Sequence, residues 1–136
     1  MKAYQPYLNF DGTAKEAMTF YQQCLGGELS IQTFGDVNAP FPGAENRVMH
    51  ARLDNGPAFL MASDSMPGTG VIQGNNVHVN IDCGTLEEIE KFFPALAEGG
   101  TVTMPLDNTF WGARFGMLTD KFGIHWMMNY ELPKNG

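Results

Sequence analysis

The chain has 136 residues, 43% of them hydrophobic, and a formal net charge of −7 at pH 7. This length and apolar content are typical of one packed domain and not of a disordered chain. The acidic balance and the scattered Lys and Arg residues argue against binding to nucleic acid or to an anionic membrane surface. No apolar stretch reaches the roughly 18 residues of a membrane-spanning helix, so no membrane span is predicted.

The first half of the chain predicts one helix among four strands. Thr13 and Glu16 have the spacing of a capping box, which marks the start of a helix. Apolar residues then recur at helical spacing until Gly26-Gly27, where the helix is expected to end. A loop is predicted over 35–46, and the predicted strands are 4–10, 28–34, 47–53 and 58–63.

The second half repeats this order after a Gly-, Pro- and Ser-rich connection at 64–76. Thr85 and Glu88 form a second predicted capping box. The helix that follows contains Pro94, which is expected to kink or break it. The predicted strands of this half are 77–83, 101–106, 113–119 and 124–130.

The chain therefore contains one β-α-β-β-β unit twice. Thr13 and Thr85 lie 72 positions apart, and the aromatic pairs Phe20-Tyr21 and Phe92-Phe93 keep this offset. We predict a single α+β domain over 1–136, with module 1 at about 1–64 and module 2 at about 76–131. One helix covers only one face of its sheet. Pairing of the modules would give a curved eight-stranded sheet, with the helices outside and a cleft inside.

Three stretches carry a resemblance to a known family: residues 6–10 with Phe20-Tyr21 and Leu25-Gly26, residues 61–64, and residues 110–126. They resemble the vicinal-oxygen-chelate superfamily of glyoxalases, bleomycin-resistance proteins and extradiol dioxygenases, and within it the PhnB-like branch. The resemblance implies the paired fold and a homodimer. In the metal enzymes of the superfamily, a divalent ion polarises two adjacent substrate oxygens.

That ion is usually held by four side chains, typically His, Glu or Gln, one each from the first and last strand of each module. In this chain His78 stands on the first strand of module 2. Its counterpart in module 1 is Pro6 at the offset of 72, or Gln5 after a slip of one residue. Alternation favours Gln5, because it shares a polar strand face with Tyr7 and Asn9.

The last strands lack the expected ligands. Met127 stands at the ligand position of module 2, and Leu60, or Met61 after a slip, stands at that of module 1. A thioether is a soft ligand that suits neither Zn²⁺, Ni²⁺ nor Mg²⁺. The resemblance therefore leaves the metal quartet incomplete, and no cofactor is assigned.

Two functions from different classes remain open. The first is binding, with or without conversion, of a small polar molecule in the cleft. The alternative is a metal-dependent lyase, isomerase or transferase with a rearranged divalent-metal site. Its candidate ligands are His50, His78, His125 and Gln5, although their spacing matches no zinc motif.

His78 is the candidate catalytic residue, because an imidazole suits proton transfer near neutral pH and the resemblance places it at the cleft. Alternation puts His78, Asn80 and Asp82 on one polar face. The predicted ligand-binding residues are Gln5, Tyr7, Asn9, His50, Arg52, Asn80 and Trp111.

The two cysteines, Cys24 and Cys83, are isolated and lie in apolar patterns, so both are expected to be inert. The lack of a cysteine framework and of a signal peptide makes the cytoplasm the default location. The predicted edge strands carry few charges to prevent pairing with another chain. Their burial in a homodimer interface would agree with this.

Overall fold

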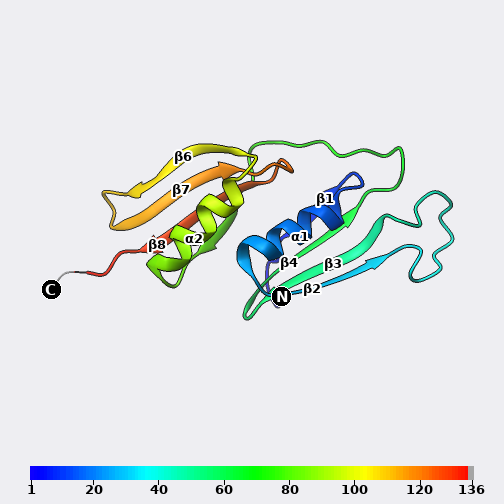
Figure 1. Cartoon of the computed structure of the whole chain (residues 1–136), viewed down its shortest axis with the longest axis horizontal. Helices are drawn as coiled ribbons and strands as arrows, with labels where there is room; N and C mark the ends of the chain where they lie inside the picture. Colours follow the sequence, from blue (N-terminus) through cyan, green and yellow to red (C-terminus); the bar gives the residue numbers. More distant parts are fainter. Residues whose placement is uncertain (135–136) are drawn as a thin grey trace. The chain divides into compact units, whose positions relative to one another are not determined.

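The chain divides into two compact units, Met1–Ile72 and Gln73–Gly136. The structure is a computed structural model that describes residues 1–134. Each unit has a four-stranded sheet with one helix packed on one face (Figure 1). Among the described residues, no helix is long and apolar enough to cross a membrane.

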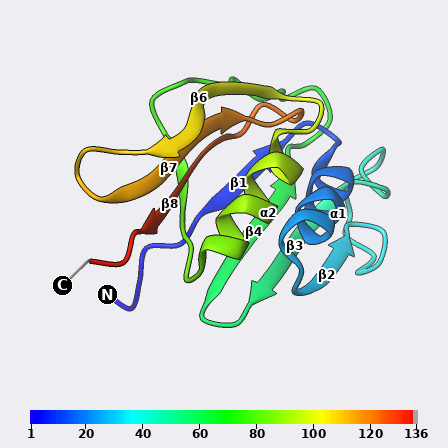
Figure 2. The same cartoon turned by 60° about the vertical axis from the view of Figure 1, so that its left-hand side comes forward.

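The two units have the same topology. In each, the first strand runs parallel to the last strand, and the remaining pairs are antiparallel. In Figure 2, β2, β3 and β4 run side by side with α1 next to them. Unit 1 has the order β1-β4-β3-β2 and comprises β1 (Tyr7–Phe10), α1 (Ala14–Leu25), β2 (Glu28–Thr33), β3 (Val48–Asn55) and β4 (Ala58–Asp64). Unit 2 has the order β5-β8-β7-β6 and comprises β5 (Val79–Asp82), α2 (Leu86–Ala97), β6 (Thr101–Asn108), β7 (Ala113–Thr119) and β8 (His125–Glu131). The predicted pair of β-α-β-β-β modules is confirmed.

Each sheet has one buried face and one face that no helix of its unit covers. The buried side chains of β3 and β4, such as Leu53 and Leu60, alternate with half-buried ones. We call the opposite side the helix-free face. In unit 1 it carries Tyr7, Asn9, His50, Arg52, Phe59, Met61 and Ser63. In unit 2 it carries His78, Asn80, Met104, Phe115, Met117, His125 and Met127.

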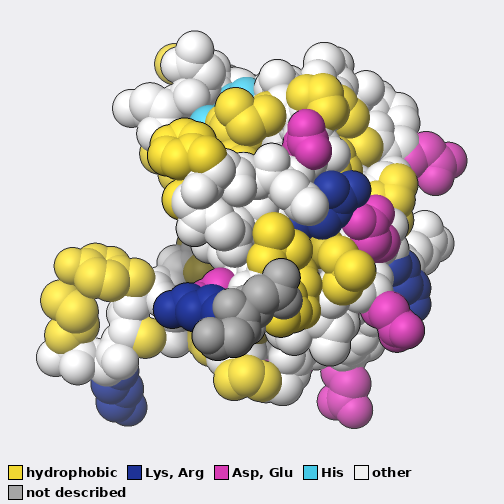
Figure 3. All heavy atoms as spheres, turned by 90° about the vertical axis from the view of Figure 1, so that its left-hand side faces the viewer, with side chains coloured by type: hydrophobic (Ala, Val, Ile, Leu, Met, Phe, Trp, Pro, Cys, Tyr) yellow, Lys and Arg dark blue, Asp and Glu magenta, His cyan; other side chains and the backbone are white. Residues whose placement is uncertain are grey.

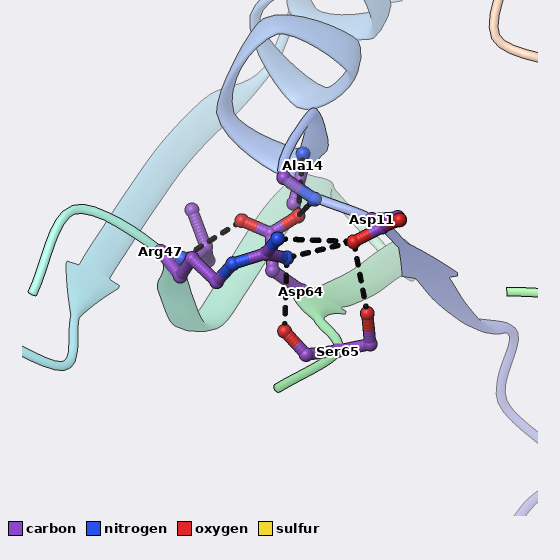
Figure 4. Close-up of polar contacts among 7 residues, drawn as sticks. Asp11, Ala14, Arg47, Asp64 and Ser65 are labelled. Atoms are coloured by element: carbon purple, nitrogen blue, oxygen red, sulfur yellow. Dashed lines mark hydrogen bonds and ion pairs between the residues drawn. The ribbon is translucent and has the colours of Figure 1, made fainter. Parts of the chain in front are cut away.

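The predicted capping box at Thr13 is wrong, although α1 begins where expected. Thr13 has φ −112° and ψ 11°, outside the extended region of a capping residue, and its side chain makes no capping bond. A buried carboxylate, Asp64, takes its place (Figure 4). Its donors are the backbone N–H groups of Gly12, Ala14 and Val48, at 2.9, 3.0 and 2.9 Å.

An ion pair lies beside this carboxylate. The guanidinium of Arg47 donates to Asp11 Oδ1 from both terminal nitrogens at 3.0 Å and to the backbone carbonyl of Ser65 at 3.0 Å (Figure 4). Asp11 and Ser65 directly follow β1 and β4, so Arg47 joins the ends of two parallel strands.

The second capping box is confirmed. Thr85 Oγ1 accepts the N–H of Glu88 at 3.1 Å, and the Glu88 carboxylate accepts the N–H of Gly84 at 2.7 Å. Pro94 does not break α2, which continues to Ala97. α1 ends at Leu25, before Gly26 with φ 74°, as the glycine pair predicts.

The turn over residues 120–123 has a structural role, in agreement with its interpretation as a turn. Asp120 is buried, and its Oδ1 accepts the N–H groups of Phe122 and Ile124 at 2.8 and 3.1 Å. Its Oδ2 accepts the indole N–H of the fully buried Trp126 at 2.8 Å. This carboxylate is therefore occupied by protein donors.

The two tryptophans should differ in fluorescence, because Trp126 is 0% exposed and Trp111 is 59% exposed. We expect Trp111→Phe to move the emission maximum to shorter wavelength and to lower quenching by acrylamide, since only the buried indole remains. Steady-state fluorescence with an acrylamide titration measures both. Unchanged quenching would contradict the exposed position of Trp111.

Candidate functional site

The helix-free face of unit 1 brings together four of the predicted ligand-binding residues. The hydroxyl of Tyr7 lies 3.3 Å from His50 Nδ1, and their rings are 5.8 Å apart. Because β4 separates β1 from β3, the Tyr7 side chain reaches across β4, where Met61 is its direct strand partner. Asn9 lies two pairs further along, on the same face, and its Oδ1 accepts a hydrogen bond from Ser63 Oγ at 3.5 Å.

Arg52 is the fourth of these residues, and a neighbouring acid holds it. Its guanidinium donates to Asp54 Oδ1 at 2.8 Å and lies 3.8 Å from the centroid of the Phe59 ring. Both charged groups are partly exposed, so this pair contributes little to stability. Its main effect is to hold the guanidinium over the Phe59 ring.

The helix-free face of unit 2 holds two histidines. The rings of His78 and His125 are 5.4 Å apart. His125 is occupied at both nitrogens, since Nδ1 lies 2.8 Å from Thr119 Oγ1 and Nε2 lies 2.7 Å from the carbonyl oxygen of Gly74. In the described part of the chain, no hydrogen bond involves His78. Of this pair, His78 is therefore the one available to a ligand.

The other predicted residues lie near this face. Asn80 is exposed and pairs with Met127. Trp111 lies in the β6–β7 connection, with its ring 5.0 Å from that of Phe110 and 6.0 Å from that of Phe115. Phe115, whose sequence position was open to both an aromatic ligand wall and core packing, lies on this face. Its place on the helix-free face of β7 follows from the register with β8.

The strand register settles the choice between the alternative ligand positions. Tyr7 pairs with Met61 and Asn80 pairs with Met127, so these two pairs correspond between the units. Gln5 stands two residues before Tyr7, and His78 stands two residues before Asn80. Gln5 is thus the structural counterpart of His78, and Met61 that of Met127, whereas the side chain of Leu60 is buried on the helix side.

The residues at these four positions do not fit the divalent ion of the metal enzymes. Met61 and Met127 offer thioethers where hard carboxylate or imidazole donors are expected, and thioethers are poor ligands for Zn²⁺, Ni²⁺ and Mg²⁺. The rearranged histidine site gains no support either. Among residues 1–134, no group of three His, Cys, Asp or Glu side chains could hold a metal ion.

Both cysteines are buried, as predicted. Burial, helped by the nearby carboxylates of Glu88 and Asp82, raises the pKa of the Cys83 thiol to about 11. We therefore expect slow reaction of the folded protein with Ellman's reagent at pH 8, and fast release of two thiols in denaturant. Rapid modification of Cys83 in the folded protein would contradict this.

The raised pKa of Cys83 also affects stability. The thiol ionises more easily in the unfolded chain than in the folded one, so the free energy of unfolding should fall as the pH rises from 9 towards 11.

Comparison with known proteins agrees with this arrangement. The family model of the Glyoxalase/Bleomycin resistance protein/Dioxygenase superfamily matches residues 6–128. The chain belongs to this superfamily. Protein YjdN of Escherichia coli is 34% identical to it, over 91% of the chain and 92% of that protein.

Two solved structures are similar over nearly the whole chain. The crystal structure of protein PA1353 from Pseudomonas aeruginosa has a TM-score of 0.85 and 44% identity, with 96% of this chain and all of that one covered. The PhnB protein from Bacillus cereus has a TM-score of 0.77 and 30% identity, over 95% of this chain and 99% of that one. The resemblance to the PhnB-like branch is therefore confirmed.

Proposed function

We propose that this glyoxalase-fold protein binds a small polar molecule on the helix-free sheet faces of its units. The observation that carries the proposal is the polar cluster of unit 1, in which Tyr7 and His50 are hydrogen-bonded across β4. Such a cluster on an uncovered sheet face offers several donors and acceptors at fixed positions. These fixed groups would orient a small ligand.

The two faces offer different groups to a ligand. Unit 1 provides the Tyr7 hydroxyl, the Asn9 amide and the ring of His50, whose Nε2 makes no hydrogen bond in the described residues. Unit 2 provides His78 beside His125, Asn80 beside Met127, and the indole of Trp111 beside Phe115. We assign to His78 contact with the ligand and transfer of a proton in any reaction of the bound molecule.

Arg52 is given a positioning role. Its pairing with Asp54 and Phe59 leaves it fixed beside the cluster. Its charge would favour an anionic group near Tyr7 and His50 without a direct bidentate contact. This favours ligands that combine neutral oxygens with one negative charge.

The experiment is a thermal-shift titration with three small probes that present two adjacent oxygens: lactate, catechol and acetohydroxamate. We expect at least one of them to stabilise the protein, since a ligand at 100 times its Kd contributes about 2.7 kcal/mol. The shift should persist in EDTA, because the proposed site uses no divalent ion. It should fall in Tyr7→Phe, which keeps the ring and removes the hydroxyl, and in His78→Ala.

The control is Glu87→Gln, a change at an exposed residue of α2, which should leave the shift unchanged. A probe shift that EDTA abolishes would favour the metal-dependent alternative. No shift with any probe, or equal shifts in wild type, Tyr7→Phe and His78→Ala, would reject the proposed site.

We further propose that the protein acts in the cytoplasm as a homodimer. In Figure 3, hydrophobic side chains lie at the surface among Lys, Arg, Asp and Glu side chains. Val102, an exposed apolar residue on edge strand β6, agrees with a covered edge. Light scattering coupled to size-exclusion chromatography tests the dimer, and a mass of 15.0 kDa would contradict it.

A further inference from the structure

Three methionines lie side by side on the helix-free face of unit 2. Met104 of β6 pairs with Met117 of β7 between two irregularities in the register of these strands, and Met117 pairs with Met127 of β8. Directly paired residues of neighbouring strands point to the same side of a sheet. The sheet therefore presents a continuous row of three thioethers, which we call the methionine row.

The spacing of the row suits convergence of its sulfurs. Paired Cβ atoms are about 4.5–5.5 Å apart, so the outer two methionines start about 10 Å apart. A methionine side chain has three rotatable bonds and adapts its shape easily. Met104 and Met127 can therefore lean over Met117 from either side on the helix-free face, which the burial pattern of β7 and β8 defines.

We propose that the methionine row binds one soft monovalent ion, Cu⁺, for which Ag⁺ serves as a redox-inert substitute. Thioethers are soft donors that select Cu⁺ and reject the hard divalent ions. The three donors are uncharged, which suits a cation of low charge. This function lies beyond the binding of a small polar molecule and does not depend on it.

The duplication supplies an internal control. The corresponding row of unit 1 consists of Tyr7, Met61, Arg52 and Ser30, which are paired in that order across the sheet. It has a single thioether next to a guanidinium, whose positive charge repels a cation. The same fold thus carries one row that should bind Cu⁺ or Ag⁺ and one that should not.

The test is an Ag⁺ titration of the full-length protein labelled with ¹³C in its methionine methyl groups. We expect the NMR signals of Met104, Met117 and Met127 to shift together and to saturate at one ion per chain. The signal of Met61 should stay in place. Single substitutions by Leu assign the four signals.

The decisive variant is Met117→Leu, which nearly keeps the side-chain volume and removes the middle donor. It should weaken binding of Ag⁺, and of Cu⁺ in anaerobic competition with bicinchoninate, by about tenfold or more. Met61→Leu is the matched control and should bind as wild type does. Binding to the buried thiols would be lost in the Cys24→Ala/Cys83→Ala double variant, whereas binding to the methionine row persists there. Methyl signals that do not move, or unweakened binding in Met117→Leu, would overturn the proposal.

Discussion

Replacing Asp64 with Ala is expected to lower the free energy of unfolding by about 3–5 kcal/mol, because each buried donor left without an acceptor costs about 1–3 kcal/mol. Asp64 accepts three backbone N–H groups, from Gly12, Ala14 and Val48, and two of these contacts are fully buried. The carboxylate also places a negative charge at the positive end of α1. Because domains of this size are stable by only about 5–15 kcal/mol, the variant should lie close to unfolding at room temperature. Urea denaturation followed by circular dichroism measures the change.

Two further substitutions test the reason for this loss. Asp64→Asn keeps one oxygen for Gly12 and Ala14 but turns an amide N–H towards the donor of Val48, so an intermediate loss is expected. Asp36→Ala removes an exposed carboxylate that accepts one backbone N–H, from Thr33, and should change stability far less. Equal effects of Asp64→Ala and Asp36→Ala would contradict the role of the buried carboxylate.

Replacing Trp126 with Ala is expected to cost about 3–5 kcal/mol, the usual range for removal of a buried aromatic side chain. Trp126 is completely buried on the helix side of β8, and its indole N–H is bonded to Asp120. The substitution leaves both a cavity and a buried carboxylate oxygen without that donor. Chemical denaturation of the variant gives the loss directly.

Trp126→Phe separates the two contributions. It fills most of the cavity and removes only the indole N–H, so its cost should be clearly smaller than that of Trp126→Ala. A double-mutant cycle with Asp120→Asn should give a coupling energy of about 0.5–3 kcal/mol, since the two groups are in contact. Additive effects of Trp126→Phe and Asp120→Asn would mean that the indole hydrogen bond does not stabilise unit 2.

The order of elements could be predicted from the sequence because its signals are local. Helical spacing after Thr13, the glycine pair that ends α1, and the turn at residues 120–123 all act over a few residues. The capping of α1 could not be predicted in this way. Its acceptor, Asp64, comes from the far end of β4, fifty residues from Ala14, and only the tertiary fold brings the two together.

The candidate site was harder to predict, because a sheet reverses its faces with a shift of one residue. The sequence alone left Leu60 and Met61 as alternatives, and only the pairing of Tyr7 with Met61 decides between them. The contact between Tyr7 and His50 skips a strand, so neither alternation nor the internal repeat points to it. His125 was a metal candidate by residue type, whereas its two hydrogen bonds make it structural.

The chain therefore combines the fold of the superfamily with different side chains at the positions of the metal ligands. Gln5 and His78 stand at positions where the metal enzymes of the superfamily have ligands, while Met61 and Met127 replace the hard donors of the last strands. This substitution favours ligand binding without a divalent ion. The methionine row extends the same change in donor chemistry across three strands of unit 2.

Elemental analysis of the protein, purified without added metal, tests this account most directly. We predict that Zn, Ni, Mn and Fe are each present far below one atom per chain, and that His78→Ala leaves these contents unchanged. One of these metals at close to one atom per chain, and lost in His78→Ala, would contradict the account and establish a divalent site.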